Sequence, residues 1–137
     1  RARVPDAAVR EVAAPELVPL VESGVRSGPR VRGAVAAAVA TFDEPLEALV
    51  LACTHFPLLD AEFAAVLGAH VRRIDPAERQ AENAASFARA RGGRGETGGT
   101  RYVTTGPLEP FRAAVASLGA IGPRDSFDGI TASLARR

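Results

Sequence analysis

The chain has 137 residues, of which 47% are hydrophobic and 24% are charged, and its formal net charge is +1. This length suits one ordinary domain or two incomplete lobes, and this composition predicts a folded, water-soluble chain. The 17 basic residues are all arginines and are scattered along the sequence, which argues against a nucleic-acid partner. No apolar stretch approaches the ~20 residues that a membrane-spanning helix needs.

The single cysteine cannot form an internal disulfide, so the chain fits a reducing compartment and we expect a cytoplasmic protein. The sequence shows no signal peptide at its start. It begins with Arg1 and contains no methionine. These two features predict a fragment of a longer protein, or at least a chain without its original start.

The first expected elements lie among several prolines. Residues 9–21 contain two prolines, which predict a short strand followed by an extended loop or a single helical turn. Residues 29–40 begin with proline and continue in alanines and valines, which predicts a helix, because proline suits a first helical turn. Residues 47–52 are mainly apolar and predict a strand. Residues 57–67 predict the next helix, with Gly68 at its C′ position.

The second half of the chain continues this alternation. Residues 71–74 predict a short strand, and Asp75 is placed to cap a helix over residues 76–90. Residues 101–104 predict a strand and residues 108–118 a helix, whereas the tail beyond shows little periodicity. Strands that alternate with helices predict an α/β fold with a mainly parallel sheet flanked by helices.

Residues 91–99 are rich in glycine and are expected to be mobile. The segment from Gly93 to Gly98 formally matches G-x-G-x-x-G. A dinucleotide site requires that this motif follow a strand and open a helix. Here it follows a helix and precedes a strand, so no dinucleotide site is predicted.

The most informative segment is the end of the strand over residues 47–52, where Cys53, Thr54 and His55 follow in succession. Open α/β sheets place their chemistry just beyond the carboxyl ends of strands. A thiol before a helix start feels the positive end of the helix dipole, which favours the thiolate. His55 is near enough to exchange a proton with the thiol or a substrate, and Thr54 offers a hydroxyl and a backbone N–H to a carboxylate. The alternative is a small, buried, unreactive cysteine.

The remaining polar candidates have simpler explanations. One cysteine and two histidines, His55 and His70, do not supply a zinc-ligand spacing, so no metal site is expected. His70 precedes a strand and fits a surface position. Glu22 and Asp75 more often belong to solvated turns, and Asp75 also fits a helix cap.

Residues 49–59, LVLACTHFPLL, resemble the second catalytic-cysteine motif of the glutamate racemases, typically LxLGCTHYPLL. Three further segments match the family in order. Residues 14–24, APELVPLVESG, resemble CPLxVPLVExG, and residues 71–75, VRRID, resemble VxLIDSG. Residues 102–106, YVTTG, with Phe111 after them, resemble FxTTG…F. The four motifs extend over nearly the whole chain.

The chain departs from the family pattern at several positions. Ala52 and Phe56 replace the usual glycine and tyrosine, and Ala14 replaces a frequent non-catalytic cysteine. Pro76 and Ala77 stand where the family has Ser-Gly. The family's first cysteine motif, similar to ACNT, and its early DSG loop are both missing, so the chain resembles only the last half of the family sequence.

The resemblance implies a two-lobed racemase fold, in which residues 1–74 form the end of the second lobe and residues 75–137 return to complete the first. It implies a cofactor-independent cytoplasmic isomerase that interconverts L- and D-glutamate for peptidoglycan synthesis, and thus for the cell wall and cell shape. In the family, two cysteines act on opposite faces of the substrate's α-carbon. Because one cysteine cannot serve both faces, the isolated chain is expected to be inactive.

Carried over by position, Cys53 is the acid or base on one face, His55 assists it, and Glu22 lies near that histidine. Thr54 contacts the substrate carboxylate. The implied partners are glutamate and the missing N-terminal half of the same enzyme. A homodimer is one possible assembly, and neither nucleic acid nor a membrane is implied as a partner. Two alternatives remain: a racemase for aspartate or another amino acid of the same superfamily, and a catalytically inactive α/β binding module.

Overall fold

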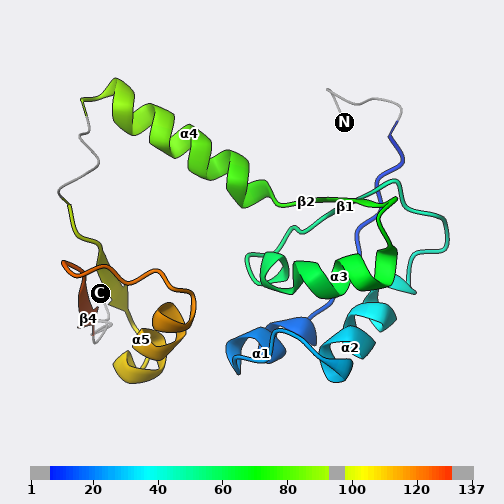
Figure 1. The fold of residues 1–137 in the computed structure, drawn as a ribbon, viewed down its shortest axis with the longest axis horizontal. Coiled ribbons are helices and arrows are strands. Elements are labelled where there is room, and N and C mark those ends of the chain that lie inside the picture. Colours follow the sequence, from blue (N-terminus) through cyan, green and yellow to red (C-terminus); the bar gives the residue numbers. More distant parts are fainter. Residues whose placement is uncertain (1–6, 93–97, 131–137) are drawn as a thin grey trace, which may run out of the picture. The chain divides into compact units, whose positions relative to one another are not determined.

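The computed structural model describes residues 7–92 and 98–130 (Figure 1). The chain divides into two compact units, Arg1–Asn83 and Ala84–Arg137, and the division falls inside helix α4 (Pro76–Ala90). Within the part of the chain that the structure describes, every helix is too short or too polar to cross a bilayer. The lobe boundary expected between residues 74 and 75 concerns the complete family fold and stays a prediction.

The first unit is built from short helices and one pair of parallel strands. Strand β1 pairs with β2 in the register Ala48↔Arg72, Leu49↔Arg73 and Val50↔Ile74. Besides the start of α4, its elements are α1 (Leu17–Glu22), α2 (Pro29–Val39), β1 (Ala48–Val50), the 3₁₀ turn η1 (Phe56–Leu59), α3 (Asp60–Leu67) and β2 (Arg72–Ile74).

A single hydrophobic core holds the first unit together. Leu59 at the end of η1 is fully buried, and Phe63 on α3 is 4% exposed. Along β1 the side chains alternate, since Leu49 packs against this core whereas Val50 is 51% exposed. The buried members are Ala14, Leu17, Leu20, Val21, Val31, Val35, Ala38, Leu51, Leu59, Phe63, Leu67 and Val71.

One carboxylate lies buried in this unit and joins α2 to α3. Glu62 is 4% exposed, and its two oxygens accept hydrogen bonds from Gly28 N at 3.0 Å and Arg32 Nε at 2.8 Å. The Gly28 amide, and then the Arg32 guanidinium, lower the pKa of Glu62 below its ordinary value of 4.5. The buried charge is therefore paired and hydrogen-bonded, as a charge in a core must be.

Glu62→Gln is expected to destabilise the first unit in a pH-dependent way. A carboxylate with a lowered folded-state pKa contributes stability that is complete above its unfolded pKa and is lost as the pH falls through the folded value. The stability difference from wild type should therefore be present at neutral pH and shrink below a pH of about 4.5. Urea unfolding at several pH values measures it, with exposed Glu44→Gln as the control. A difference independent of pH would contradict the assignment.

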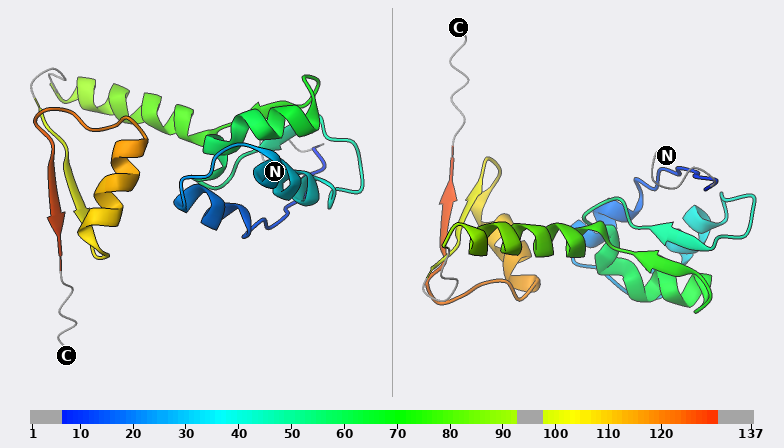
Figure 2. Two further views of the ribbon diagram at one scale, coloured as in Figure 1. Left: turned by 60° about the horizontal axis from the view of Figure 1, so that its bottom comes forward. Right: turned by 90° about the horizontal axis from the view of Figure 1, so that it is seen from above.

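The second unit contains a strand–helix–strand arrangement. Strands β3 (Arg101–Thr104) and β4 (Ser126–Gly129) pair in parallel, and α5 (Leu108–Ser117) connects them (Figure 2). Three aromatic rings form its small core. Tyr102 stacks on Phe127 with ring centroids 4.8 Å apart, and Phe111 meets both rings edge-on.

The entry to β4 is fixed by one carboxylate. Asp125 accepts hydrogen bonds from Thr100 N at 2.7 Å and Gly122 N at 2.8 Å, and these two amides lower the pKa of its carboxyl. A Cβ at Gly99 would collide with the Arg124 backbone carbonyl. The chain before β3 therefore approaches the β4 entry as closely as a glycine allows.

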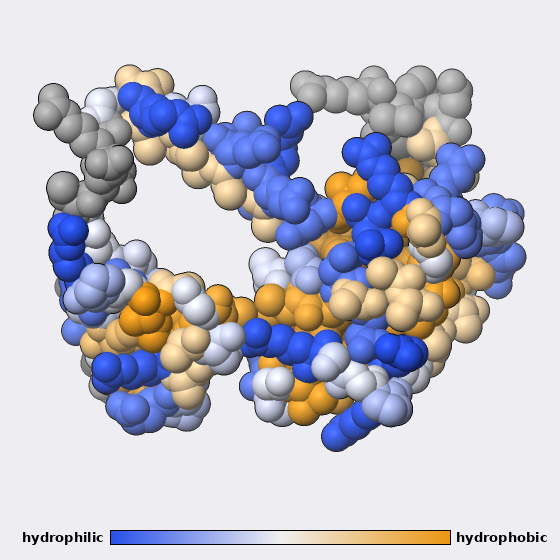
Figure 3. All heavy atoms as spheres, in the orientation of Figure 1, coloured by the Kyte–Doolittle hydropathy of each residue, from blue (hydrophilic) through white to orange (hydrophobic). Residues whose placement is uncertain are grey.

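Helix α4 differs from the other helices, because none of its residues is buried. Asp75 accepts a hydrogen bond from Ala77 N at 2.9 Å, which confirms it as the helix cap. Phe87 is 60% exposed and lies beneath the Arg91 guanidinium, 4.3 Å from the ring centroid. Figure 3 shows polar and apolar residues on separate sides of this helix.

Two sequence-based expectations were wrong, and one cannot be compared. The expected strand in residues 9–21 is absent, whereas the helical turn expected after it is present as α1, a helix of six residues that contains Pro19. Pro19 is tolerated because amides of a first turn have no intrahelical acceptor. Strand β4 lies in the tail for which no element was expected. Of the glycine-rich stretch expected to be mobile, residues 93–97 lie outside the described part of the chain.

Candidate active site

A tight turn after β1 carries three of the candidate residues, Cys53, Thr54 and His55. Leu51 extends the strand pairing, with its N–H donating to Ile74 O at 2.9 Å. The chain then bends at Cys53 and enters η1. Phe56 N donates to Cys53 O at 3.0 Å, which closes the bend, and Leu58 N donates to His55 O at 3.1 Å. The expected position beyond the carboxyl end of a strand is therefore confirmed.

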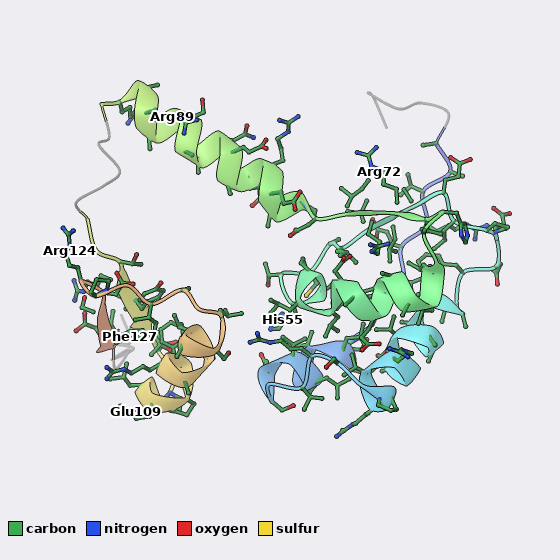
Figure 4. All side chains as sticks on the ribbon, viewed as in Figure 1. His55, Arg72, Arg89, Glu109, Arg124 and Phe127 are labelled. Atoms are coloured by element: carbon green, nitrogen blue, oxygen red, sulfur yellow. The ribbon has the colours of Figure 1, made fainter. Side chains whose placement is uncertain are left out.

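The structure brings three predicted residues, Cys53, His55 and Glu22, close together. Cys53 Sγ lies 3.6 Å from His55 Nδ1, and His55 Nε2 lies 3.6 Å from Glu22 Oε1. The imidazole side chain is 30% exposed, the Glu22 side chain is 64% exposed, and Cys53 is half-buried. Figure 4 shows His55 between the η1 turn and α1. A thiol, an imidazole and a carboxylate thus lie in series, with both ring nitrogens engaged.

This arrangement suits proton transfer. In the tautomer that carries its hydrogen on Nε2, on the side of the Glu22 carboxylate, the Nδ1 lone pair can accept the proton of the Cys53 thiol. A base that is itself oriented by a third group is the usual way to activate a nucleophile. Glu22 is the last residue of α1. The position of that helix therefore determines where the Glu22 carboxylate lies relative to His55 Nε2.

The other candidate residues are placed differently. Thr54 lies in the same turn and is exposed, so its hydroxyl and amide are accessible to a ligand. His70 is exposed and follows Gly68, the glycine with φ 77° that ends α3. Asp75 caps α4. Across residues 7–92 and 98–130, no three His, Cys, Asp or Glu side chains are grouped closely enough to hold a metal ion.

The sequence analysis did not identify an ion pair beside this turn. Arg73 Nε donates to Asp60 Oδ1 at 2.7 Å, which links β2 to the first residue of α3. A shallow hollow lies at this link, and its lining residues are Leu51, Pro57, Asp60, Arg73, Asp75 and Glu78. Strand alternation offered a signal, because Arg73 pairs with core-facing Leu49 and therefore shares its face of the sheet.

Known proteins with similar sequences and folds are racemases. A glutamate racemase of Symbiobacterium thermophilum is 41% identical over 119 residues, which cover 83% of this chain and 43% of the relative. The structure of glutamate racemase from Thermus thermophilus in complex with beta-chloro-D-alanine matches with a TM-score of 0.72 and 32% identity, over 87% of this chain and 46% of that one. No family model matches the chain.

A glutamate racemase isoform from Bacillus anthracis matches with a TM-score of 0.78 and 27% identity, over 94% of this chain and 49% of that one. The helices, the parallel strand pairs and the strand-end turn therefore form an α/β fold that matches part of the solved glutamate racemases. In sequence as well, the chain is similar to glutamate racemases. It spans less than half of the length of the relatives it matches.

Proposed function

We propose that this chain forms one half of a cofactor-independent glutamate racemase, which interconverts L- and D-glutamate and supplies D-glutamate for peptidoglycan. The observation that carries the proposal is the series Cys53–His55–Glu22 on the turn after β1. It combines a motif that resembles the family's second cysteine motif with the geometry that thiol activation needs. The similarity to the named glutamate racemases supports glutamate as the substrate.

In the proposed mechanism, the Cys53 thiolate removes the α-proton from one face of glutamate. His55 takes the thiol proton beforehand, and Cys53 becomes a thiol again when it gains the α-proton. The proton on His55 is later released to solvent, from which the second thiolate is reprotonated, and Glu22 holds the imidazole in the required tautomer. The exposed hydroxyl and amide of Thr54 bind the substrate carboxylate, where negative charge develops as the proton leaves. The proton for the opposite face comes from a second thiol.

That second thiol must come from another polypeptide segment, because Cys53 is the single cysteine of the sequence. We propose that the segment belongs to the part of the family fold that this chain does not span. The exposed side of the first strand pair supports this, since Ala48 and Val50 present small apolar side chains to solvent there. The domain roles follow: residues 1–74 complete one lobe and residues 75–137 complete the other.

The proposal is tested by following the exchange of the α-proton of glutamate into D₂O by proton NMR, with aspartate as the competing substrate. The protein is this chain combined with the missing half of a related glutamate racemase. Exchange and racemisation of glutamate, with little of either for aspartate, would support it. A preference for aspartate would favour another racemase of the superfamily, and no exchange of either would favour a binding module.

His55→Gln is expected to slow alkylation of Cys53 by iodoacetamide about tenfold at neutral pH, because glutamine cannot accept the thiol proton. The rate is measured by mass spectrometry on the chain, whose single cysteine gives a single product. His70→Gln is the matched control, since His70 is the one other histidine and lies outside the turn. Equal rates for wild type and His55→Gln would show that the imidazole does not activate the thiol.

A further inference from the structure

Two adjacent residues of β2 hold both ends of the turn that carries Cys53 and His55. At the start of the turn, Leu51 N donates to Ile74 O at 2.9 Å. At its end, both Asp60 carboxylate oxygens accept from Arg73, with Nε at 2.7 Å and Nη2 at 3.4 Å. Ten residues of chain, 51–60, are thus fixed at both ends to one short stretch of strand.

The Arg73–Asp60 pair is well suited to fixing a position. The Arg73 side chain is only 23% exposed, and a side-on guanidinium with two donors fixes the orientation of a carboxylate as well as its distance. Asp60 is also the first residue of α3, where a negative charge interacts favourably with the helix dipole. Its neighbour Leu59 is fully buried, so the end of η1 is held by packing and by the ion pair together.

The hydrogen bonds within the turn do not by themselves fix its orientation relative to the strands. Phe56 N to Cys53 O and Leu58 N to His55 O define the shape of the turn, but they leave its tilt against the strands open. A tilt of η1 would move His55 relative to both Cys53 and Glu22. The two 3.6 Å separations depend on that tilt.

We propose that Arg73 is a positioning residue, which acts through Asp60 to hold the η1 turn so that His55 lies between the Cys53 thiol and Glu22. The inference rests on the proposed function in that the Cys53–His55 pair is taken as the reactive pair. Arg73 itself contacts neither residue through any hydrogen bond or ion pair found among the described residues, and its effect is entirely indirect.

The test is a double-mutant cycle on Cys53 alkylation in the chain itself. In each background, the rate of Cys53 alkylation by iodoacetamide is measured twice, once with His55 present and once with His55→Gln. The measured quantity is the ratio of the first rate to the second. In Arg73→Gln and in Asp60→Asn, this ratio is expected to fall about fivefold, as for residues that are coupled through the backbone segment that connects them. Arg72→Gln is the matched control, because Arg72 is the exposed preceding residue of β2 (Figure 4). It should leave the ratio unchanged.

Circular dichroism establishes which variants fold. A ratio equal to that of wild type in a folded Arg73→Gln or Asp60→Asn variant would overturn the proposal. If Arg73→Gln fails to fold, Asp60→Asn removes the same pair from its more exposed side and decides the question. Loss of folding in both would also overturn it, since the pair would then be required for the fold. The ratio needs no substrate, so a failure of glutamate exchange is recognised separately.

Discussion

Cys53→Ser is expected to lower glutamate racemisation by roughly 10³-fold or more when this chain is combined with the missing half of the family fold. A serine hydroxyl fills nearly the same space as the thiol, but it is a far weaker acid and stays protonated beside His55. The base on one face of the substrate is then lost, while the turn keeps its shape. Release of the α-proton into D₂O and the change in optical rotation measure the effect from both enantiomers.

The control adds a hydroxyl beside the site without removing the thiol. Ala52 is exposed and precedes Cys53, so Ala52→Ser should racemise glutamate at nearly the wild-type rate. The 137-residue chain alone should racemise neither enantiomer, because it offers a single thiol. Full conversion of both enantiomers by that chain, or an active Cys53→Ser variant, would contradict a mechanism with two thiols.

Leu59→Ala is expected to destabilise the first unit by roughly 2–5 kcal/mol, the usual cost of truncating a fully buried leucine. Leu59 is 0% exposed and belongs to the core that joins η1 with the three helices. Its removal leaves a cavity directly beneath the turn that carries Cys53. Urea unfolding followed by circular dichroism gives the total loss, and amide hydrogen exchange assigns it to the first unit.

The comparison for Leu59 is a leucine that contributes little burial. Leu118 in the second unit is 50% exposed, so Leu118→Ala should change the free energy of unfolding by less than about 1 kcal/mol. Similar losses for the two variants would mean that Leu59 is not a core residue in solution. Enhanced exchange confined to residues after α4 would place the loss in the wrong unit.

The elements that were predicted well carry their own local signals. Asp75 followed by proline gives a cap and a first turn at once, and the helix over residues 76–90 begins and ends as expected. Gly68 ends α3 with a positive φ of 77°, which glycine adopts readily. Helix α2 and strand β3 also lie where the sequence predicted them. In these segments a few neighbouring residues determine the outcome.

The elements that were missed depend on partners distant in the sequence. Strand β4 is short, and its pairing depends on β3 and on the stacking of Tyr102 against Phe127. A strand of four residues stabilised by distant partners leaves little periodicity of its own. The helix expected over residues 57–67 is divided into η1 and α3. A proline close to the start of a helix did not reveal where the tighter turn ends.

In the candidate site, too, contacts between residues close in sequence could be predicted from the residues themselves, whereas contacts between distant residues could not. Cys53 and His55 are two residues apart, so the sequence alone indicated that they could meet. Glu22 lies 33 positions from His55, and its place beside this histidine was expected only through the resemblance, yet its Oε1 lies 3.6 Å from His55 Nε2. The Arg73–Asp60 pair was not predicted, because strand alternation indicates which face of the sheet Arg73 shares but not that its side chain reaches the start of the preceding helix.

Helix α4 has a consequence for how the chain melts. It is 15 residues long and none of them is buried, so its helicity depends on its cap and on contacts between its own side chains. Helices of this length are marginal without tertiary packing. The first unit has its own core, whereas Val115 is the one buried residue described in the second unit. An exposed helical connection of this kind transmits little cooperativity. Heating should therefore produce more than one transition, and a single midpoint temperature would not describe the chain.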